Sequence, residues 1–240
     1  MFVGARDDAG RSSYERLASL ATDAASVLDI ACGTGALLSL IQDIAPAARL
    51  AGIDLSEPEL GLAVNRLPNA YFAVARSQAL PIRTGSIDVV MCHMALMLMD
   101  HPAHALAEIR RVLRPGGRFG AIVNRAAPPD AIAKTVLKAL RPAWERAGPS
   151  VQPPPLGDSR VLDADALTAL VGGQFDEARV DPFDVVRDVP RENLWAFLVD
   201  SLYGLDAIDA VEANERLDAA ELPDPVRWTI PMAQAQGRAR

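Results

Sequence analysis

The sequence is poor in the residues that mark several protein classes. Among its 240 residues are two cysteines, Cys32 and Cys92, too few for a disulfide framework and without the neighbours of a metal site. No stretch reaches the roughly 18 uninterrupted apolar residues of a membrane-spanning helix, and residues 1–10 lack the pattern of a signal peptide. We therefore expect a cytoplasmic protein with no membrane partner and no bound metal.

Positive charge is also scarce. The chain has 24 basic and 31 acidic residues, a net charge of −7, and only two lysines, Lys134 and Lys138. Nucleic-acid binding requires a local excess of basic groups, so we expect no nucleic-acid partner. Arg110, Arg111 and Arg114 fall at the end of a predicted helix, where cations complement the helix dipole, and we interpret them that way.

Short apolar runs alternate with segments of helical period through the first half of the chain. Strands are predicted at 27–31, 49–55, 70–75, 87–91 and 118–123. Helices are predicted between them, one of them opened by the capping box of Ser56 and Glu59 and another over 104–113. This alternation predicts an α/β fold with a parallel sheet.

The pattern is weaker elsewhere. Residues 1–26 have a helical pattern. Beyond Asn124 we predict helices, strands and one proline-rich loop: helices at 131–147, 163–171 and 191–203, strands at 178–186 and 226–233, and the loop at 148–157.

The first predicted strand ends in a glycine turn, Asp29-Ile30-Ala31-Cys32-Gly33-Thr34-Gly35. Glycines between a strand and a helix let the backbone approach a ligand closely, and the helix N-terminus adds free N–H groups. Neither the G-x-G-x-x-G dinucleotide pattern nor a phosphate loop is present. The alternative is a tight turn that binds nothing.

A second acid, Asp54, stands at the end of the second predicted strand, 19 residues after Gly35. In a doubly wound sheet this position faces the ligand crevice, where a carboxylate can accept hydrogen bonds from a ribose diol. The alternative is a turn or capping aspartate, but Ser56 already supplies the cap.

Five segments, in this order and spacing, resemble the class I S-adenosylmethionine-dependent methyltransferases: 27–35, 52–56, 80–81, 86–90 and 111–117. The resemblance covers about residues 25–125. It implies a Rossmann-like, doubly wound, seven-stranded sheet of order 3-2-1-4-5-7-6, with strand 7 antiparallel and helices on both faces. It also implies S-adenosyl-L-methionine as methyl donor and S-adenosyl-L-homocysteine as product.

The resemblance further implies a cofactor site at the strand ends and the loops after them, formed by Asp29, Ala31, Cys32, Gly33, Gly35, Asp54, Leu55, Ser77, Gln78, Cys92 and His93. Asp29 would hold the cofactor's amino group, and Asp54 the ribose hydroxyls. Leu55 would pack on the adenine. Ser77 and Gln78 would lie at the adenine edge, and Cys92 and His93 beside the methionine and acceptor end.

Three positions depart from the family's pattern. Ala31 stands where glycine is usual, and its methyl group narrows the turn. Arg76 stands where an acid often accepts a hydrogen bond from the adenine amino group, which an arginine cannot do. Either Arg76 points to solvent and Gln78 replaces the acid, or cofactor affinity is lower. Leu98 stands where many relatives carry a histidine.

His93 is the candidate catalytic residue, a general base at the end of the fourth strand. Methyl transfer is an in-line displacement from an activated sulfonium, so positioning can supply most of the rate, and a base is needed only for an acceptor that must lose a proton. The alternative is a packed or surface histidine. His101 and His104 are interpreted as a surface pair at a helix start.

We expect one domain over 1–240, with an N-terminal helical cap at 1–26, a cofactor-binding core at 27–125, and an acceptor lid with sheet completion at 126–240. The acceptor is expected to be a small molecule, methylated on oxygen or nitrogen. The alternatives are methylation of tRNA or protein, and a protein that binds S-adenosylmethionine without methylating. The sequence leaves monomer and homodimer open.

Overall fold

The computed structural model describes residues 4–148, 157–201, 205 and 208–240. The chain forms two compact units, which we describe separately. The larger unit contains residues 13–126, 157–183 and 232–240, and the smaller contains 1–12, 127–156 and 184–231. The expectation of one domain over the whole chain stays a prediction.

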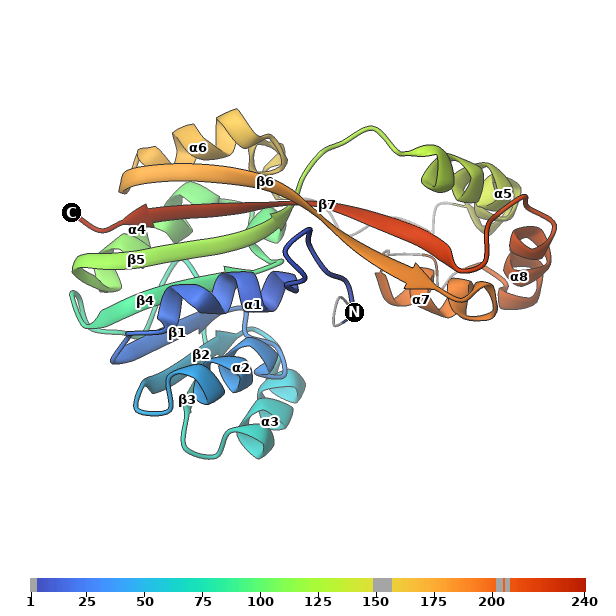
Figure 1. The fold of residues 1–240 in the computed structure, drawn as a ribbon. Coiled ribbons are helices and arrows are strands. Elements are labelled where there is room, and N and C mark those ends of the chain that lie inside the picture. The colour runs from blue at the N-terminus through green and yellow to red at the C-terminus, as the bar shows by residue number, and fades with distance from the viewer. Residues whose placement is uncertain (1–3, 149–156, 202–204, 206–207) are drawn as a thin grey trace. The chain divides into compact units, whose positions relative to one another are not determined.

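A seven-stranded sheet organises the fold, and its strands run in the order β3-β2-β1-β4-β5-β7-β6 (Figure 1). Their bounds are Ser26–Ile30 (β1), Arg49–Asp54 (β2), Tyr71–Val74 (β3), Ile87–His93 (β4), Leu113–Asn124 (β5), Asp176–Val189 (β6) and Val226–Arg238 (β7). β1 to β5 pair in parallel, whereas β7 pairs antiparallel with β5, from Arg118 opposite Arg238 to Asn124 opposite Met232. The predicted strand order and direction are confirmed.

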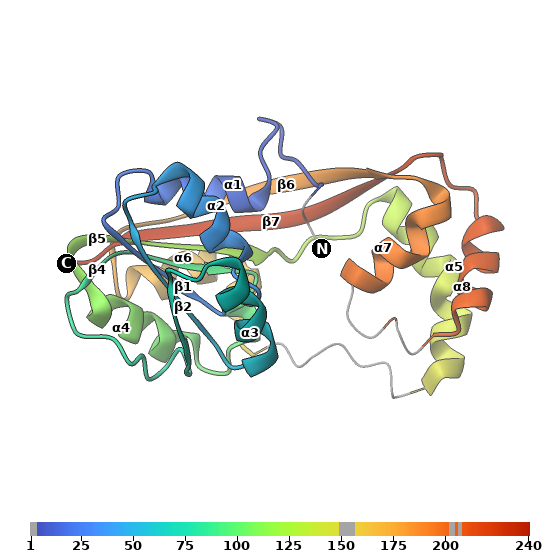
Figure 2. The same cartoon turned by 90° about the horizontal axis from the view of Figure 1, so that it is seen from below.

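Helices cover both faces of the sheet in the larger unit. α1 (Ser13–Ala18) packs with α2 (Ala36–Ile44) on one face, and α4 (Pro102–Val112) packs with α6 (Ala164–Gly172) on the other (Figure 2). α3 (Glu57–Arg66) packs on β2 and β3, and its Ser56 cap accepts a hydrogen bond from the Glu59 amide. β1 is buried at all five positions, which explains its unbroken apolar pattern.

The helical prediction for residues 1–26 is wrong over most of its length. Between residues 4 and 26, which the structure describes, helix occurs only in α1 and in a short 3-10 turn at Ser19–Ala21. Before α1, the Asp7 carboxylate accepts hydrogen bonds from the amides of Ala9 and Arg11, and Gly10 has a φ of +74°. Local side-chain bonds of this kind compete with helix formation.

The smaller unit contains α5 (Ala131–Ala147), α7 (Leu194–Ser201) and α8 (Ala210–Asp218). α8 was not predicted, because its sequence is mostly polar and buries only Ala213 and Leu217. Its C-terminal carbonyls are bound by the Arg191 guanidinium, which donates to Leu217 O at 3.0 Å. Most of the predicted loop, 149–156, and the end of the helix predicted at 191–203 lie outside the described residues.

None of the helices in the described part of the chain is long and apolar enough to cross a membrane.

Candidate functional site

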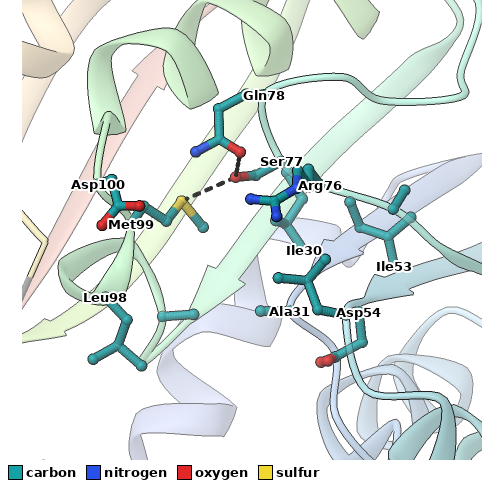
Figure 3. Close-up of a pocket in the computed structure, with 13 residues that line it drawn as sticks. Ile30, Ala31, Ile53, Asp54, Arg76, Ser77, Gln78, Leu98, Met99 and Asp100 are labelled. Carbon is teal, nitrogen blue, oxygen red and sulfur yellow. Dashed lines mark hydrogen bonds between the residues drawn. The ribbon is translucent and has the colours of Figure 1, made fainter. Parts of the chain in front are cut away.

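A cavity of about 250 Å³ opens at the carboxyl ends of β1 and β2 in the larger unit (Figure 3). Its lining residues come from four successive strand ends and the loops that follow them: Ile30, Ala31, Ile53, Asp54, Leu55, Ala75, Arg76, Ser77, Gln78, Ala95, Leu98, Met99 and Asp100. Five of the predicted cofactor residues are among them. Small-molecule sites commonly have volumes of about 300 to 1,000 Å³, so this cavity suits part of a nucleoside ligand.

The glycine turn after β1 has the backbone conformation that the sequence indicates. Gly33 and Gly35 have φ values of +49° and +75°, in the left-handed region. Ala31 also has a positive φ, +57°, which strains a residue with a Cβ atom. A Cβ at Gly35 would lie 3.3 Å from the Ala63 side chain on α3, so this glycine also allows the turn to pack closely.

Asp54 ties the glycine turn to the start of α3. Its Oδ2 accepts a hydrogen bond from the Gly33 amide at 2.8 Å, and its Oδ1 accepts one from the Ser56 amide at 2.9 Å. Each carboxylate oxygen has a further lone pair, and Asp54 lines the cavity. The side chain can therefore hold the turn and accept ligand hydroxyls together.

Asp29 lies in β1, two residues before Ala31, is 2% exposed and is not among the residues that line the cavity. Its Oδ1 has no hydrogen-bond partner among the described residues. Burial and the nearby charge of Asp54 raise the pKa of Asp29 well above its usual range. An unpaired, buried acid next to a second acid fits a ligand that brings a cationic amino group and hydroxyls, as S-adenosylmethionine does.

The loop after β3 forms the opposite wall. The Ser77 hydroxyl is buried and lies 3.2 Å from Gln78 Oε1 and 3.3 Å from the Met99 sulfur (Figure 3). Arg76 also lines the cavity and is exposed. Leu55 is 63% exposed at the mouth, which leaves its side chain free to cover a flat ring.

His93 and Cys92, at the end of β4, lie outside the lining of this cavity. The His93 Nε2 is 2.9 Å from the hydroxyl of Ser13, and the Tyr14 ring stacks on the imidazole with 3.9 Å between centroids. Burial lowers the pKa of His93 to about 3, so the ring is neutral at pH 7. Burial raises the pKa of the Cys92 thiol to about 12, which keeps it protonated.

Ser13 was missed as a partner of His93, and only the separation of 80 residues in sequence hid it. A serine at the start of a helix is ordinarily interpreted as a cap. His101 and His104 are exposed and form a tilted pair with 5.5 Å between rings at the start of α4, as expected. No group of three or more metal-ligating side chains occurs among the residues that the structure describes.

Comparisons with known proteins point to a methyltransferase domain in the larger unit. Residues 28–121 match the family described as methyltransferase domain. A malonyl-[acyl-carrier protein] O-methyltransferase of Hahella chejuensis is 38% identical over 109 residues, covering 44% of this chain and 39% of the relative. The chain thus spans about two fifths of the length of the curated relatives it matches.

Solved structures share the fold. The YcgJ protein of Bacillus subtilis has a TM-score of 0.64 at 18% identity, covering 95% of this chain and 98% of its own. A geranyl diphosphate C-methyltransferase of Streptomyces coelicolor, in complex with S-adenosyl-L-homocysteine, has a TM-score of 0.56 at 12% identity, covering 95% of this chain and 75% of its own. Residues 28–121 are thus similar to a methyltransferase domain, and the chain shares its fold, strand order included, with these solved structures.

Proposed function

We propose that the protein transfers a methyl group from S-adenosylmethionine to an oxygen or nitrogen atom of a small-molecule acceptor. The observation that carries the cofactor assignment is the unpaired, buried carboxylate of Asp29 beside Asp54 and the glycine turn. The net charge of −7 favours a small acceptor over tRNA. The O-methyltransferase relative supports oxygen, and the C-methyltransferase of similar fold makes carbon the alternative.

The chain's own residues have separate tasks in this proposal. S-adenosylmethionine, when bound, supplies a methyl group on a sulfonium that leaves readily. Asp29 accepts hydrogen bonds from the amino group, and Asp54 accepts them from the ribose hydroxyls. Cys32 and the glycines at 33 and 35 provide the backbone beneath the ligand.

The adenine end of the ligand lies against the opposite wall of the cavity, which the loop after β3 forms. Leu55 covers the ring from the mouth, and Ser77 and Gln78 face its edge. Arg76 cannot accept a hydrogen bond from the adenine amino group. We therefore propose that Gln78 Oε1 takes this role.

His93 as the general base stays a prediction, and the structure favours the packed alternative. Its Nε2 lies against Ser13, and its pKa of about 3 makes the imidazole a weak base at neutral pH. An acceptor whose nucleophilic atom is already ionised would need no base. We infer that the residues around His93 shape the acceptor end and that positioning governs the rate.

Calorimetry with S-adenosylhomocysteine tests the proposal. Asp54→Ala should weaken binding at least ~10-fold, because a charge-assisted hydrogen bond contributes about 1.5–3 kcal/mol. Asp43→Ala is the matched control, since Asp43 is an exposed acid on α2 away from the cavity. No binding by the folded wild-type protein would overturn the cofactor assignment.

The acceptor is tested next, with wild-type protein, S-adenosylmethionine and a panel of small carboxylic acids, phenols and amines. Methylated product from the panel is the expected result. Cofactor binding with no product from these small molecules, from tRNA or from protein would instead favour the protein that binds S-adenosylmethionine without methylating.

A further inference from the structure

An ion pair on α4 lies outside the cavity and takes no part in the function proposed so far. Glu108 and Arg111 stand three residues apart, with Arg111 Nε 2.7 Å from Glu108 Oε1 and Arg111 Nη2 2.8 Å from Glu108 Oε2. Their side chains are 22% and 33% exposed. Two parallel N–H to carboxylate bonds fix the orientation of the guanidinium, which a single contact would not.

The remaining donors of Arg111 reach the loop between β3 and β4. Nη2 donates to the carbonyl of Leu80 at 3.0 Å, and Nη1 donates to the carbonyl of Ile82 at 2.8 Å and to the hydroxyl of Thr84 at 3.2 Å. A guanidinium has five N–H donors, and all five are therefore engaged. Lysine cannot reproduce this arrangement, because its three donors share one atom.

Glu108 binds the same loop directly. Its Oε2 accepts a hydrogen bond from the Leu80 amide at 2.9 Å, so Leu80 is held through both its N–H and its carbonyl. The backbone continues the attachment, since Gly85 donates to the Arg111 carbonyl at 2.9 Å. The second half of the loop is thus bonded to the last turns of α4.

The first half of the loop forms the cavity wall. Ser77 and Gln78 precede Leu80 by three and two residues, and both line the cavity. The Ser77 hydroxyl also lies 3.3 Å from the sulfur of Met99, which precedes α4 (Figure 3). The segment from 99 to 111 therefore contacts this loop at Ser77, within its cavity-lining stretch, and again at Leu80, two residues after it.

We propose that Glu108 and Arg111 are a positioning pair, which holds Ser77 and Gln78 at the adenine edge and thereby sets the preference for adenine over a base with a different edge. The inference rests on the proposed cofactor site. Neither side chain touches the ligand in this proposal. A pair with a purely structural role would change stability and overall affinity but leave the preference between bases intact.

The test compares S-adenosylhomocysteine with S-inosylhomocysteine, which carries an oxo group in place of the adenine amino group. Both are titrated calorimetrically into the wild-type protein, Glu108→Gln and Arg111→Lys. We expect the wild type to prefer the adenine compound at least ~10-fold, and each variant to lose at least threefold of that preference. The double variant should lose no more than the larger single loss, because the two residues act as one unit.

Arg110→Lys is the matched control. Arg110 lies on the same turn of α4. In Arg110→Lys, the ratio of the affinities for the adenine and inosine compounds should stay within twofold of the wild-type ratio. Should Glu108→Gln or Arg111→Lys fail to fold, Thr84→Ala removes one hydrogen bond of the network at an exposed position and should reduce the ratio in the same direction.

The outcomes separate the two proposals. Failure of the wild type to bind S-adenosylhomocysteine would overturn the proposed function. Binding with no preference between the two compounds, or a preference that survives in the Glu108 and Arg111 variants and in Thr84→Ala, would overturn the positioning role alone.

Discussion

The ends of β1 and β4 lie side by side in the sheet, yet their polar side chains differ in whether their atoms have hydrogen-bond partners. Near the end of β1, the Asp29 carboxylate is buried, and its Oδ1 has no hydrogen-bond partner among the residues that the structure describes. At the end of β4, His93 is satisfied by Ser13 and stacked by Tyr14. A buried polar atom without a partner costs free energy that a ligand can recover, whereas a satisfied one offers a ligand little.

This contrast supports the proposed cofactor site near the end of β1, where a charged ligand can pair the free atom, whereas the end of β4 contributes packing. Both side chains have shifted pKa values, and burial causes both shifts. Burial favours the neutral form in each case, so it raises the pKa of the acid and lowers that of the histidine. Of the two, only the acid has a buried side-chain atom without a hydrogen-bond partner among the described residues.

Asp29→Asn should break the contrast most strongly. We expect it to weaken binding of S-adenosylhomocysteine about 10- to 100-fold, since a charge-assisted bond is lost, while the unliganded protein melts at a higher temperature. In the wild type, affinity should rise with pH through the raised pKa of Asp29, because the ligand's amino group favours the carboxylate. Titration calorimetry at several pH values measures the affinities, and a thermal melt of each unliganded protein measures the melting temperature.

Asp43→Asn is the control for this change and should alter neither property. Unchanged affinity in Asp29→Asn would remove Asp29 from the amino-group site.

His93→Gln tests the β4 side of the contrast. The pKa of His93 is about 3 in the folded protein and about 6.5 when unfolded, so the unfolded state binds more protons between those values. Stability contributed by neutral His93 is therefore present above pH 6.5 and lost as pH falls, by about 2 kcal/mol between pH 7 and pH 5.

Urea unfolding at the two pH values should show this extra loss in the wild type and not in His93→Gln. An equal loss in both proteins would mean that His93 ionises freely, and it would restore the general-base hypothesis.

Ala31→Gly should have the smallest effect, and it tests the backbone strain in the turn that follows β1. Glycine relieves the positive φ of this residue, and we expect a gain of about 0.5–1 kcal/mol in the free energy of unfolding. Ala107→Gly, at an exposed position inside α4, should instead lose about 1 kcal/mol. Thermal melts of both variants measure the difference, and a loss in Ala31→Gly would show that the methyl group contributes packing.

Sequence reasoning located β1 to β4 well because each is a short apolar run ending in turn residues, but β5 begins at Leu113 and not at the predicted 118. It was weaker for β7, which continues to Arg238 beyond the predicted 233, because Gln234 and Gln236 are polar. Those residues pair with Ile122 and Gly120 of β5. Backbone pairing to a neighbouring strand, which no local pattern records, extends β7 there.

The site shows the same division. The positions of Asp29, Asp54 and the glycines relative to the strands could be predicted because these residues are close in sequence to the strands that place them. Ser13 and Arg111 could not, because their partners His93 and Leu80 are distant along the chain. Arg111 was interpreted as a cation complementing the helix dipole, whereas the structure shows five hydrogen bonds that join it to Glu108 and the loop.

Cys32 has a consequence for how opening of the glycine turn can be measured. Its thiol is 7% exposed, burial raises its pKa to about 12, and its sulfur occupies the space that a side chain at Gly52 would need. A thiol-reactive dye can modify it only when the turn opens. The rate of labelling at Cys32 therefore reports how often the turn opens, and a bound ligand should lower that rate.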